Sequence, residues 1–149
     1  MRWVPPTKER VTCVALHLRR QDAIEVFCSH GVNPWQAVHQ SWQSSPDCRC
    51  IEGDDFSTVG IAGIAPGGCV WLLATDDLLA TASHRRQFLR GAKQWIDSLI
   101  ADGAGPLHNW ALAKNTTTLR WLRWLGFAIG QPRPMGPCGE LFCYVERAG

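Results

Sequence analysis

The sequence predicts one domain of mixed α and β structure (α+β, or mixed α/β), with a central mixed β-sheet flanked by helices. Its hydrophobic residues recur with a helical period in the first third of the chain, form apolar strand-like runs in the middle, and return to a helical period after Ser83. The 149 residues suffice for one hydrophobic core and show no internal repeat or linker. The predicted order is helices, a β-meander, and then helix, strand, helix and strand. This order is typical of such a domain.

Residues 7–43 are predicted to form helices. Thr7 can cap a segment whose apolar residues recur at spacings of three and four. Asp22 is predicted to open a second helix. The pair Asn33-Pro34 has the cap-plus-proline pattern of a third helix start. A loop rich in serine and proline then ends the helical part.

Residues 48–74 are predicted to form the β-meander. A short strand leads into a Gly-Asp-Asp turn, and an apolar strand of small residues follows. Pro66-Gly67-Gly68 favours a tight reversal into the run Cys69–Ala74. That run is apolar enough to be a buried strand of a hairpin.

The second half of the chain is predicted to alternate helices and strands. A helix over 83–101 carries apolar residues on one face and ends in a glycine- and proline-rich stretch. The remaining predicted elements are a strand at 107–113, a helix at 115–125 and a last strand at 140–146.

The run from Asn115 to Phe127 is the most informative part of the sequence. Asn115 can cap a helix by accepting a hydrogen bond from a free backbone N–H group. Gly126 suits the left-handed position just past a helix end, and Phe127 can pack back onto Leu122. This spacing resembles the closing helix of the GNAT superfamily of acyl-CoA-dependent N-acetyltransferases. In that superfamily a tyrosine stands five residues before the phenylalanine, and here that position is Leu122.

The resemblance covers roughly residues 57–147 and implies a GNAT-like domain. If acetyl-CoA binds, it implies that Leu73 and Asn115 contact it. Such an enzyme needs a glycine-rich turn for the pyrophosphate, a hydrogen-bond donor for the departing thiolate, and a base. The expected turn, 75–83, contains no glycine and two aspartates, whose charge opposes a pyrophosphate. Leu122 cannot act as a donor, so no catalytic residue is assigned.

Other candidate groups have two interpretations each. Four basic residues near the start of the 83–101 helix either attract an anion or form a solvated face: Arg85, Arg86, Arg90 and Lys93. The acidic residues before the hairpin either supply a base or simply form a turn: Glu52, Asp54 and Asp55. Three residues near the C-terminus are candidate proton donors or structural side chains: Cys138, Cys143 and Tyr144.

Composition excludes several classes of function. A net charge of +2 does not indicate nucleic-acid binding, and no apolar run is long enough to span a membrane. The N-terminus has no apolar segment of the secretory type, and seven cysteines favour a reduced setting over a disulfide framework. Cys48-Arg-Cys50 lacks the spacing of a zinc site, so no metal is expected.

Eight tryptophans predict a contact surface, with a candidate partner-binding patch at Arg120, Arg123 and Trp124.

A second resemblance spans nearly the whole chain. It is carried by Trp71-Leu-Leu-Ala-Thr-Asp76, by the Arg-Trp-Leu repeat within Asn115–Phe127, and by Pro134-Met-Gly-Pro-Cys-Gly-Glu-Leu-Phe142. These runs resemble a family of tailed-bacteriophage (podophage) internal virion, or core, proteins with an acetyltransferase-like fold.

The second resemblance implies a virion-associated structural or assembly protein without catalysis. The expected location is the virion, with the host cytoplasm during synthesis and assembly. Expected partners are core, portal or tail proteins, or further copies of the chain. Two alternatives remain: an acyl-CoA-dependent N-acetyltransferase that modifies a host protein or a small amine, and a phage effector that binds a host enzyme.

Overall fold

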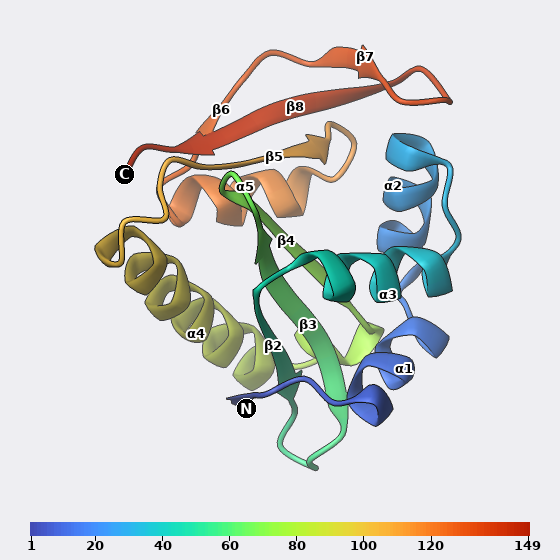
Figure 1. Ribbon diagram of the computed structural model, residues 1–149, viewed down its shortest axis with the longest axis vertical. Coiled ribbons are helices and arrows are strands. Elements are labelled where there is room, and N and C mark those ends of the chain that lie inside the picture. Colours follow the sequence, from blue (N-terminus) through green and yellow to red (C-terminus); the bar gives the residue numbers. More distant parts are fainter.

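A mixed sheet with helices on both faces forms the framework of the computed structural model, which describes residues 1–149 (Figure 1). The strands follow the order β1-β2-β3-β4-β5-β8-β6, and β7 pairs with β8. They comprise β1 (Arg2–Val4), β2 (Asp47–Glu52), β3 (Thr58–Ala65), β4 (Cys69–Ala74), β5 (Leu107–Leu112), β6 (Ala128–Ile129), β7 (Arg133–Met135) and β8 (Glu140–Arg147). The helices are α1 (Lys8–Leu16), α2 (Arg20–His30), α3 (Pro34–Ser44), α4 (Ala82–Ala101) and α5 (Thr116–Trp124), with a 3₁₀ turn, η1 (Asp76–Leu79).

The three N-terminal helices form as predicted, with one correction. The Thr7 hydroxyl accepts the Arg10 N–H at the start of α1, and Asn33 with Gln36 forms a capping box at the start of α3. Asp22 does not open α2, because that helix already begins at Arg20. Asp22 is buried in the first turn instead, where its carboxylate binds groups from another element.

The predicted β-meander is also present. Strands β2, β3 and β4 are antiparallel neighbours, and the β3–β4 hairpin turns between Ala65 and Cys69. Strand β1 was not predicted from the sequence, nor were β6 and β7. Each of these strands has two or three residues, too few to show a period, and each is formed by pairing with a longer strand.

The two faces of the sheet are covered by different helices. Helices α4 and α5 pack on one face, where the largest core cluster includes Phe88, Ile96 and Leu119. Helices α1 and α3 pack on the other face through Val14 and Val38. Helix α2 lies next to α3, where Val26 packs against the same cluster, and beside the C-terminal ends of β4 and β5 (Figure 1). These two cores fix the positions of β4 and β5, between which the candidate site lies.

Helix α5 ends as the sequence predicts. Gly126 has a φ of 95°, a left-handed conformation that glycine adopts without strain. The Phe127 N–H donates to the Leu122 carbonyl at 3.0 Å, and the Phe127 ring is buried. The helix start differs from the prediction. Asn115 stands at the cap position, but its side chain makes no capping hydrogen bond.

Candidate functional site

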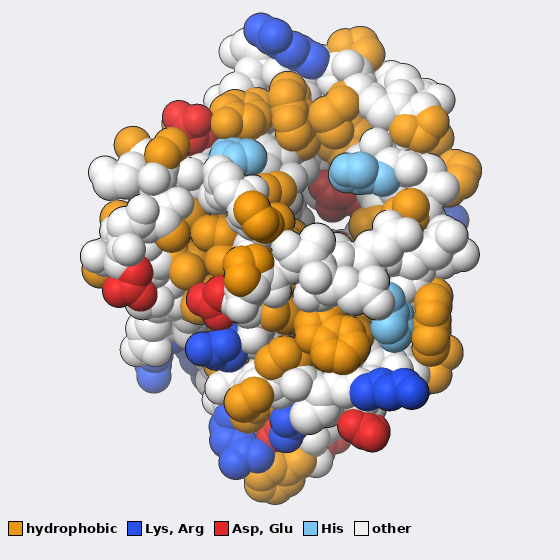
Figure 2. Space-filling model, in the orientation of Figure 1, with side chains coloured by type: hydrophobic (Ala, Val, Ile, Leu, Met, Phe, Trp, Pro, Cys, Tyr) orange, Lys and Arg blue, Asp and Glu red, His pale blue; other side chains and the backbone are white.

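A cavity of about 650 Å³ lies where β4 and β5 part. These strands are parallel neighbours, but they are paired only at Cys69 and His108 and then separate. Polar side chains from α2 and α3 line one part of the cavity, and apolar side chains from α4 and α5 line the opposite part. Figure 2 shows a hollow in the middle of the face it presents, with an acidic side chain visible in it.

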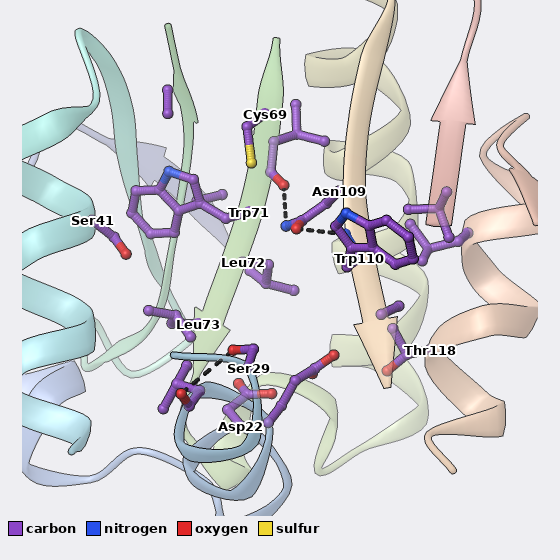
Figure 3. Close-up of a pocket in the computed structure, with 18 of the residues that line it drawn as sticks. Asp22, Ser29, Ser41, Cys69, Trp71, Leu72, Leu73, Asn109, Trp110 and Thr118 are labelled. Atoms are coloured by element: carbon purple, nitrogen blue, oxygen red, sulfur yellow. Dashed lines mark hydrogen bonds between the residues drawn. The ribbon is translucent and has the colours of Figure 1, made fainter. Parts of the chain in front are cut away.

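Asn109 closes the narrow end of the gap between the strands. Its amide Nδ2 donates to the Val70 carbonyl of β4 at 2.7 Å, and its Oδ1 accepts the Trp110 N–H at 2.6 Å. In Figure 3 this side chain reaches from β5 toward β4, with Leu72 below it in the gap. The Asn109 side chain thus takes main-chain groups that a continuous parallel ladder would have paired with each other.

Asp22 and Arg19 occupy the edge of β4 at the wide end of the gap. The Asp22 carboxylate accepts the Ala74 N–H at 2.9 Å and the Arg19 Nε–H at 2.8 Å. The Arg19 backbone N–H donates to the Ala74 carbonyl at 2.9 Å. Burial raises the pKa of the Asp22 carboxyl, and the Arg19 charge opposes that shift.

Glu25 occupies the facing edge of β5. One carboxylate oxygen accepts the Leu112 N–H at 2.7 Å, and the other accepts the Asn115 side-chain amide at 3.4 Å. Burial raises the pKa of the Glu25 carboxyl, while the bond from Leu112 lowers it by a smaller amount. A carboxylate in a cavity with a raised pKa is a candidate general base, because its pKa is brought closer to neutral pH.

Helix α5 directs two side chains at the cavity from the opposite side. Thr118 and Leu122 both line it and, being four residues apart, lie on the same face of the helix. Figure 3 shows the Thr118 side chain on the gap side of α5. Leu122 supplies an apolar wall where the acetyltransferase resemblance places a tyrosine.

A smaller groove of about 310 Å³ adjoins the cavity between α4 and α5. Arg85, Arg120 and Trp124 line it, and Trp124 is 56% exposed. Phe88 and Trp121 line both spaces and pack edge to face, with ring centroids 5.6 Å apart. This aromatic pair therefore forms the partition between the basic groove and the cavity.

The turn between β4 and α4 differs from a glycine-rich phosphate-binding turn. It forms the 3₁₀ turn η1, in which the Thr75 hydroxyl accepts the Asp77 N–H at 3.3 Å. Asp76 and Asp77 are exposed, and Thr81 caps α4 by accepting the His84 N–H at 3.0 Å. Side chains thus bind N–H groups of this segment, and two carboxylates stand beside it.

The two residues predicted to contact acetyl-CoA lie at the cavity in different ways. Leu73 lines it, but this residue pairs with Ile61 on β3 and its side chain packs in the α1–α3 core. Asn115 reaches the site only through its hydrogen bond to Glu25, which takes the place of the expected helix cap. Contact of either residue with acetyl-CoA stays a prediction.

The acidic residues considered as bases lie away from the cavity. Glu52 forms ion pairs with Arg2 and Arg10, at 2.6 and 3.0 Å. Asp54 binds the N-terminal amine at 3.1 Å, and the Asp55 carboxylate accepts the Ser57 hydroxyl. These contacts make all three part of the local structure around the β2–β3 turn, and none lines the cavity.

The candidate donors and the basic cluster are also dispersed. Tyr144 donates to Glu146 at 3.1 Å on β8, Cys143 is buried in that strand, and Cys138 is exposed in the β7–β8 turn. Of the basic cluster, Arg85 alone lines the groove, whereas Lys93 pairs with Asp97 along α4 at 2.7 Å. The structure brings together Arg85 and Arg120, which the sequence had placed in separate groups.

Sequence reasoning missed the polar side chains that shape the cavity. Asp22 had been assigned a capping role, and no role had been given to Glu25, Asn109 or Thr118. The one available signal was the i, i+3 spacing of Asp22 and Glu25, which puts both carboxylates on one face of α2.

No group of three or more histidine, cysteine, aspartate or glutamate side chains could hold a metal ion. No helix has the length and apolar character needed to cross a membrane.

Known proteins resemble the chain in structure. A ribosomal-protein-alanine N-acetyltransferase from Brucella melitensis matches with a TM-score of 0.70 at 13% identity, over 100% of both chains. A GNAT-family acetyltransferase from Bacillus anthracis matches with a TM-score of 0.64 at 7% identity, over 97% of this chain and 91% of that one. A spermidine N-acetyltransferase mutant from Vibrio cholerae matches with a TM-score of 0.63 at 6% identity, over 99% and 92%.

No family model and no curated protein matches the sequence. The structural matches show that the chain has the fold of GNAT acetyltransferases, which confirms the fold predicted from Asn115–Phe127. They carry no indication of a phage family, so that part of the sequence-based expectation stays a prediction.

Proposed function

We propose that this protein is an acyl-CoA-dependent N-acetyltransferase that works in the cavity between β4 and β5 and modifies a protein or a small amine. One observation carries the proposal. At the point where two parallel strands part, the cavity holds Glu25, a half-buried carboxylate whose pKa is raised. A well-formed cavity with a perturbed titratable group is the default location for an active site.

The cavity and the groove suit different parts of an acetyl-CoA donor. The apolar side of the cavity, between the sheet and α4 and α5, suits an extended acyl-bearing arm. Arg85 and Arg120 in the adjoining groove suit its phosphates, because guanidinium groups bind phosphate oxygens in a bidentate way. The η1 turn does not fit the pyrophosphate, since Asp76 and Asp77 stand there in place of glycine. The donor supplies an acyl thioester, from which the acyl group passes to nitrogen.

Glu25 is the group best placed to accept a proton from the acceptor amine. Helix α2 holds its carboxylate at the wide end of the gap, and the polar part of the cavity beside it offers a route for the amine. An ammonium must lose a proton before its nitrogen can attack, and general bases contribute roughly 10² to 10⁴ in rate. Leu112 and Asn115 keep the Glu25 carboxylate in position through their hydrogen bonds.

Calorimetric titration of the purified protein with acetyl-CoA tests the proposal directly. The expected result is saturable binding in the micromolar range, weakened in an Arg85→Ala, Arg120→Ala double variant. An Arg20→Ala, Arg133→Ala variant, which removes two exposed arginines outside the groove, serves as the charge-matched control. Absence of heat at millimolar acetyl-CoA would overturn the enzymatic proposal.

A second candidate is a non-catalytic virion component built on the same fold. Hydrogen bonds at the start of α2 and within it favour this candidate. Asp22, Arg19 and Glu25 already bind the backbone groups of Ala74 and Leu112 at the strand edges. A donor arm lying along those edges would have to displace them. The whole-chain sequence resemblance supports the same candidate, with core, portal or tail proteins or further copies of the chain as partners.

Mass spectrometry of purified phage particles tests the second candidate. A stoichiometric copy number of the chain in particles, together with no acetyl-CoA binding, would favour a structural role in the virion. Absence from particles would exclude that role. If acetyl-CoA also failed to bind, the remaining candidate would be an effector that binds a host enzyme through exposed apolar side chains such as Phe27, Trp35 and Trp124.

A further inference from the structure

Transfer of an acyl group from a thioester leaves a thiolate, whose negative charge needs a hydrogen-bond donor in an apolar cavity. Leu122 has no donor group, and Tyr144 lies on β8 with its hydroxyl bonded to Glu146. Cys143 is buried in the core with its strand. The donor must therefore come from another side chain that lines the cavity.

Thr118 has the position and the chemistry of such a donor. It is half-buried and lines the cavity one helical turn before Leu122, on the same face of α5. Its side chain lies on the gap side of the helix, across the cavity from Asp22 (Figure 3).

The hydroxyl of Thr118 is also not committed elsewhere. The hydroxyls of Thr7, Thr75 and Thr81 accept backbone N–H groups at helix starts. Thr118 is the third residue within α5, past the cap position at Asn115, and its hydroxyl forms no hydrogen bond within the protein. A threonine in a helix can otherwise bond to a carbonyl of the preceding turn.

We propose that the Thr118 hydroxyl donates the hydrogen bond that stabilises the departing thiolate; this assignment rests on the proposed acetyltransferase function. In the transfer, the amine nitrogen bonds to the acyl carbon, the carbon–sulfur bond breaks, and sulfur keeps the bonding electron pair. Glu25 holds the proton from the amine. Thr118 keeps its own proton, because a thiol with a pKa of about 8.5 is far more acidic than an aliphatic hydroxyl. Solvent then protonates the thiolate.

The test compares Thr118→Val, which keeps the shape and removes the hydroxyl, with Thr118→Ser, which keeps the hydroxyl. Thiol release from acetyl-CoA is measured with a chromogenic reagent. Thr118→Val should lower kcat by about tenfold to hundredfold, the effect of losing one hydrogen bond to a charged group, with KM for acetyl-CoA unchanged. Thr118→Ser should retain most of kcat. Thr116→Val, at an exposed position of α5, is the matched control and should behave as the wild type.

A rescue variant separates a chemical role from a structural one. Adding Leu122→Tyr to Thr118→Val restores a hydroxyl one turn further along the same helix face, and kcat should recover at least tenfold. Unchanged kcat in Thr118→Val, an equal loss in Thr118→Ser, or a defect confined to KM would each overturn the assignment while leaving the enzyme intact. A wild type that releases no thiol and binds no acetyl-CoA would overturn the proposed function, and this assignment with it.

Discussion

At the scale of single residues, the cavity depends on two carboxylates that backbone groups bind: Asp22, which is buried, and Glu25, which is half-buried. Asp22 and Glu25 each accept a strand N–H, from Ala74 and Leu112 respectively. A buried carboxylate is unfavourable unless it is paired or hydrogen-bonded. Only Asp22 has a cation as partner, Arg19. The two carboxylates therefore have different expected roles: Asp22 stabilises the fold, and Glu25 remains available for proton transfer.

Removing the charge of Asp22 should destabilise the protein. Asp22→Asn leaves Arg19 buried without a counter-charge, since both side chains are less than 10% exposed. Breaking a buried pair in this way costs about 3 kcal/mol in the free energy of unfolding. Urea denaturation measures the change. Asp47→Asn, which breaks an exposed pair with Arg49, is the control and should change stability little. Equal effects of the two substitutions would contradict the assignment.

The raised pKa of Glu25 predicts opposite pH trends for activity and for stability. The base works only when ionised, so kcat/KM should rise with pH through the raised pKa. The folded protein holds a proton that the unfolded chain has already released. The stability contribution is therefore present below the unfolded pKa and lost as pH rises through the folded pKa.

Glu25→Gln should remove both pH trends and lower kcat by roughly 10² or more, because an amide cannot accept the proton. Thiol release and urea denaturation over about pH 4 to 8 measure the two trends. Glu9→Gln, at an exposed position on α1, is the control and should keep both. A Glu25→Gln variant with wild-type turnover would exclude Glu25 as the base.

At the scale of elements, the position of α2 decides whether the gap between β4 and β5 is open. The narrow end is closed from within the sheet by Asn109, and the wide end is closed by α2. Helix α2 is in turn fixed by packing at its C-terminal end, where Cys28 contacts Phe142 and Leu112 in a small separate core. The gap therefore depends on β4, β5 and α2 together rather than on either strand alone.

Hydrogen exchange of single amides should show the contact between α2 and β5. In Glu25→Ala the Leu112 N–H loses its acceptor and should exchange at least about tenfold faster, the effect of losing a bond to a charged group. The Ala111 N–H provides the internal control, because Ala111 pairs with Cys143 on β8 and should stay protected. Equal acceleration at both amides would indicate that β5 itself had loosened, which would contradict the local role of Glu25.

At the scale of the whole molecule, the two cores leave all seven cysteines unpaired and most of them inaccessible. Burial raises the pKa of Cys48 to about 12 and that of Cys50 to about 11. A thiolate is the reactive form, so these thiols should be inert in the native state. Cys138 is the exposed cysteine.

Titration with a chromogenic disulfide should therefore show one fast thiol in the native protein and seven in denaturant. Cys138→Ser should abolish the fast phase, whereas Cys48→Ser should leave it unchanged. Fast reaction of a buried thiol such as Cys48 or Cys50 in the native wild type would mean that the cores open more readily than their packing implies.

The sequence alone determined the features that depend on neighbouring residues. It predicted α1 and α3 from their caps, the strand Cys69–Ala74 from its apolar run, and the end of α5 at Gly126. It also showed a glycine-free turn after β4 and a leucine at position 122. These predictions succeed because caps, turns and periodicity act within a few positions of the chain.

Only the tertiary structure decided which side chains meet at the gap. Asp22 and Ala74 are 52 positions apart, and Glu25 and Leu112 are 87 apart. Local pattern places a carboxylate on a helix face, but the atoms it binds depend on how the two cores pack α2 against the sheet. For that reason the sequence predicted only a helix start at Asp22 and no role for Glu25, although both residues line the cavity.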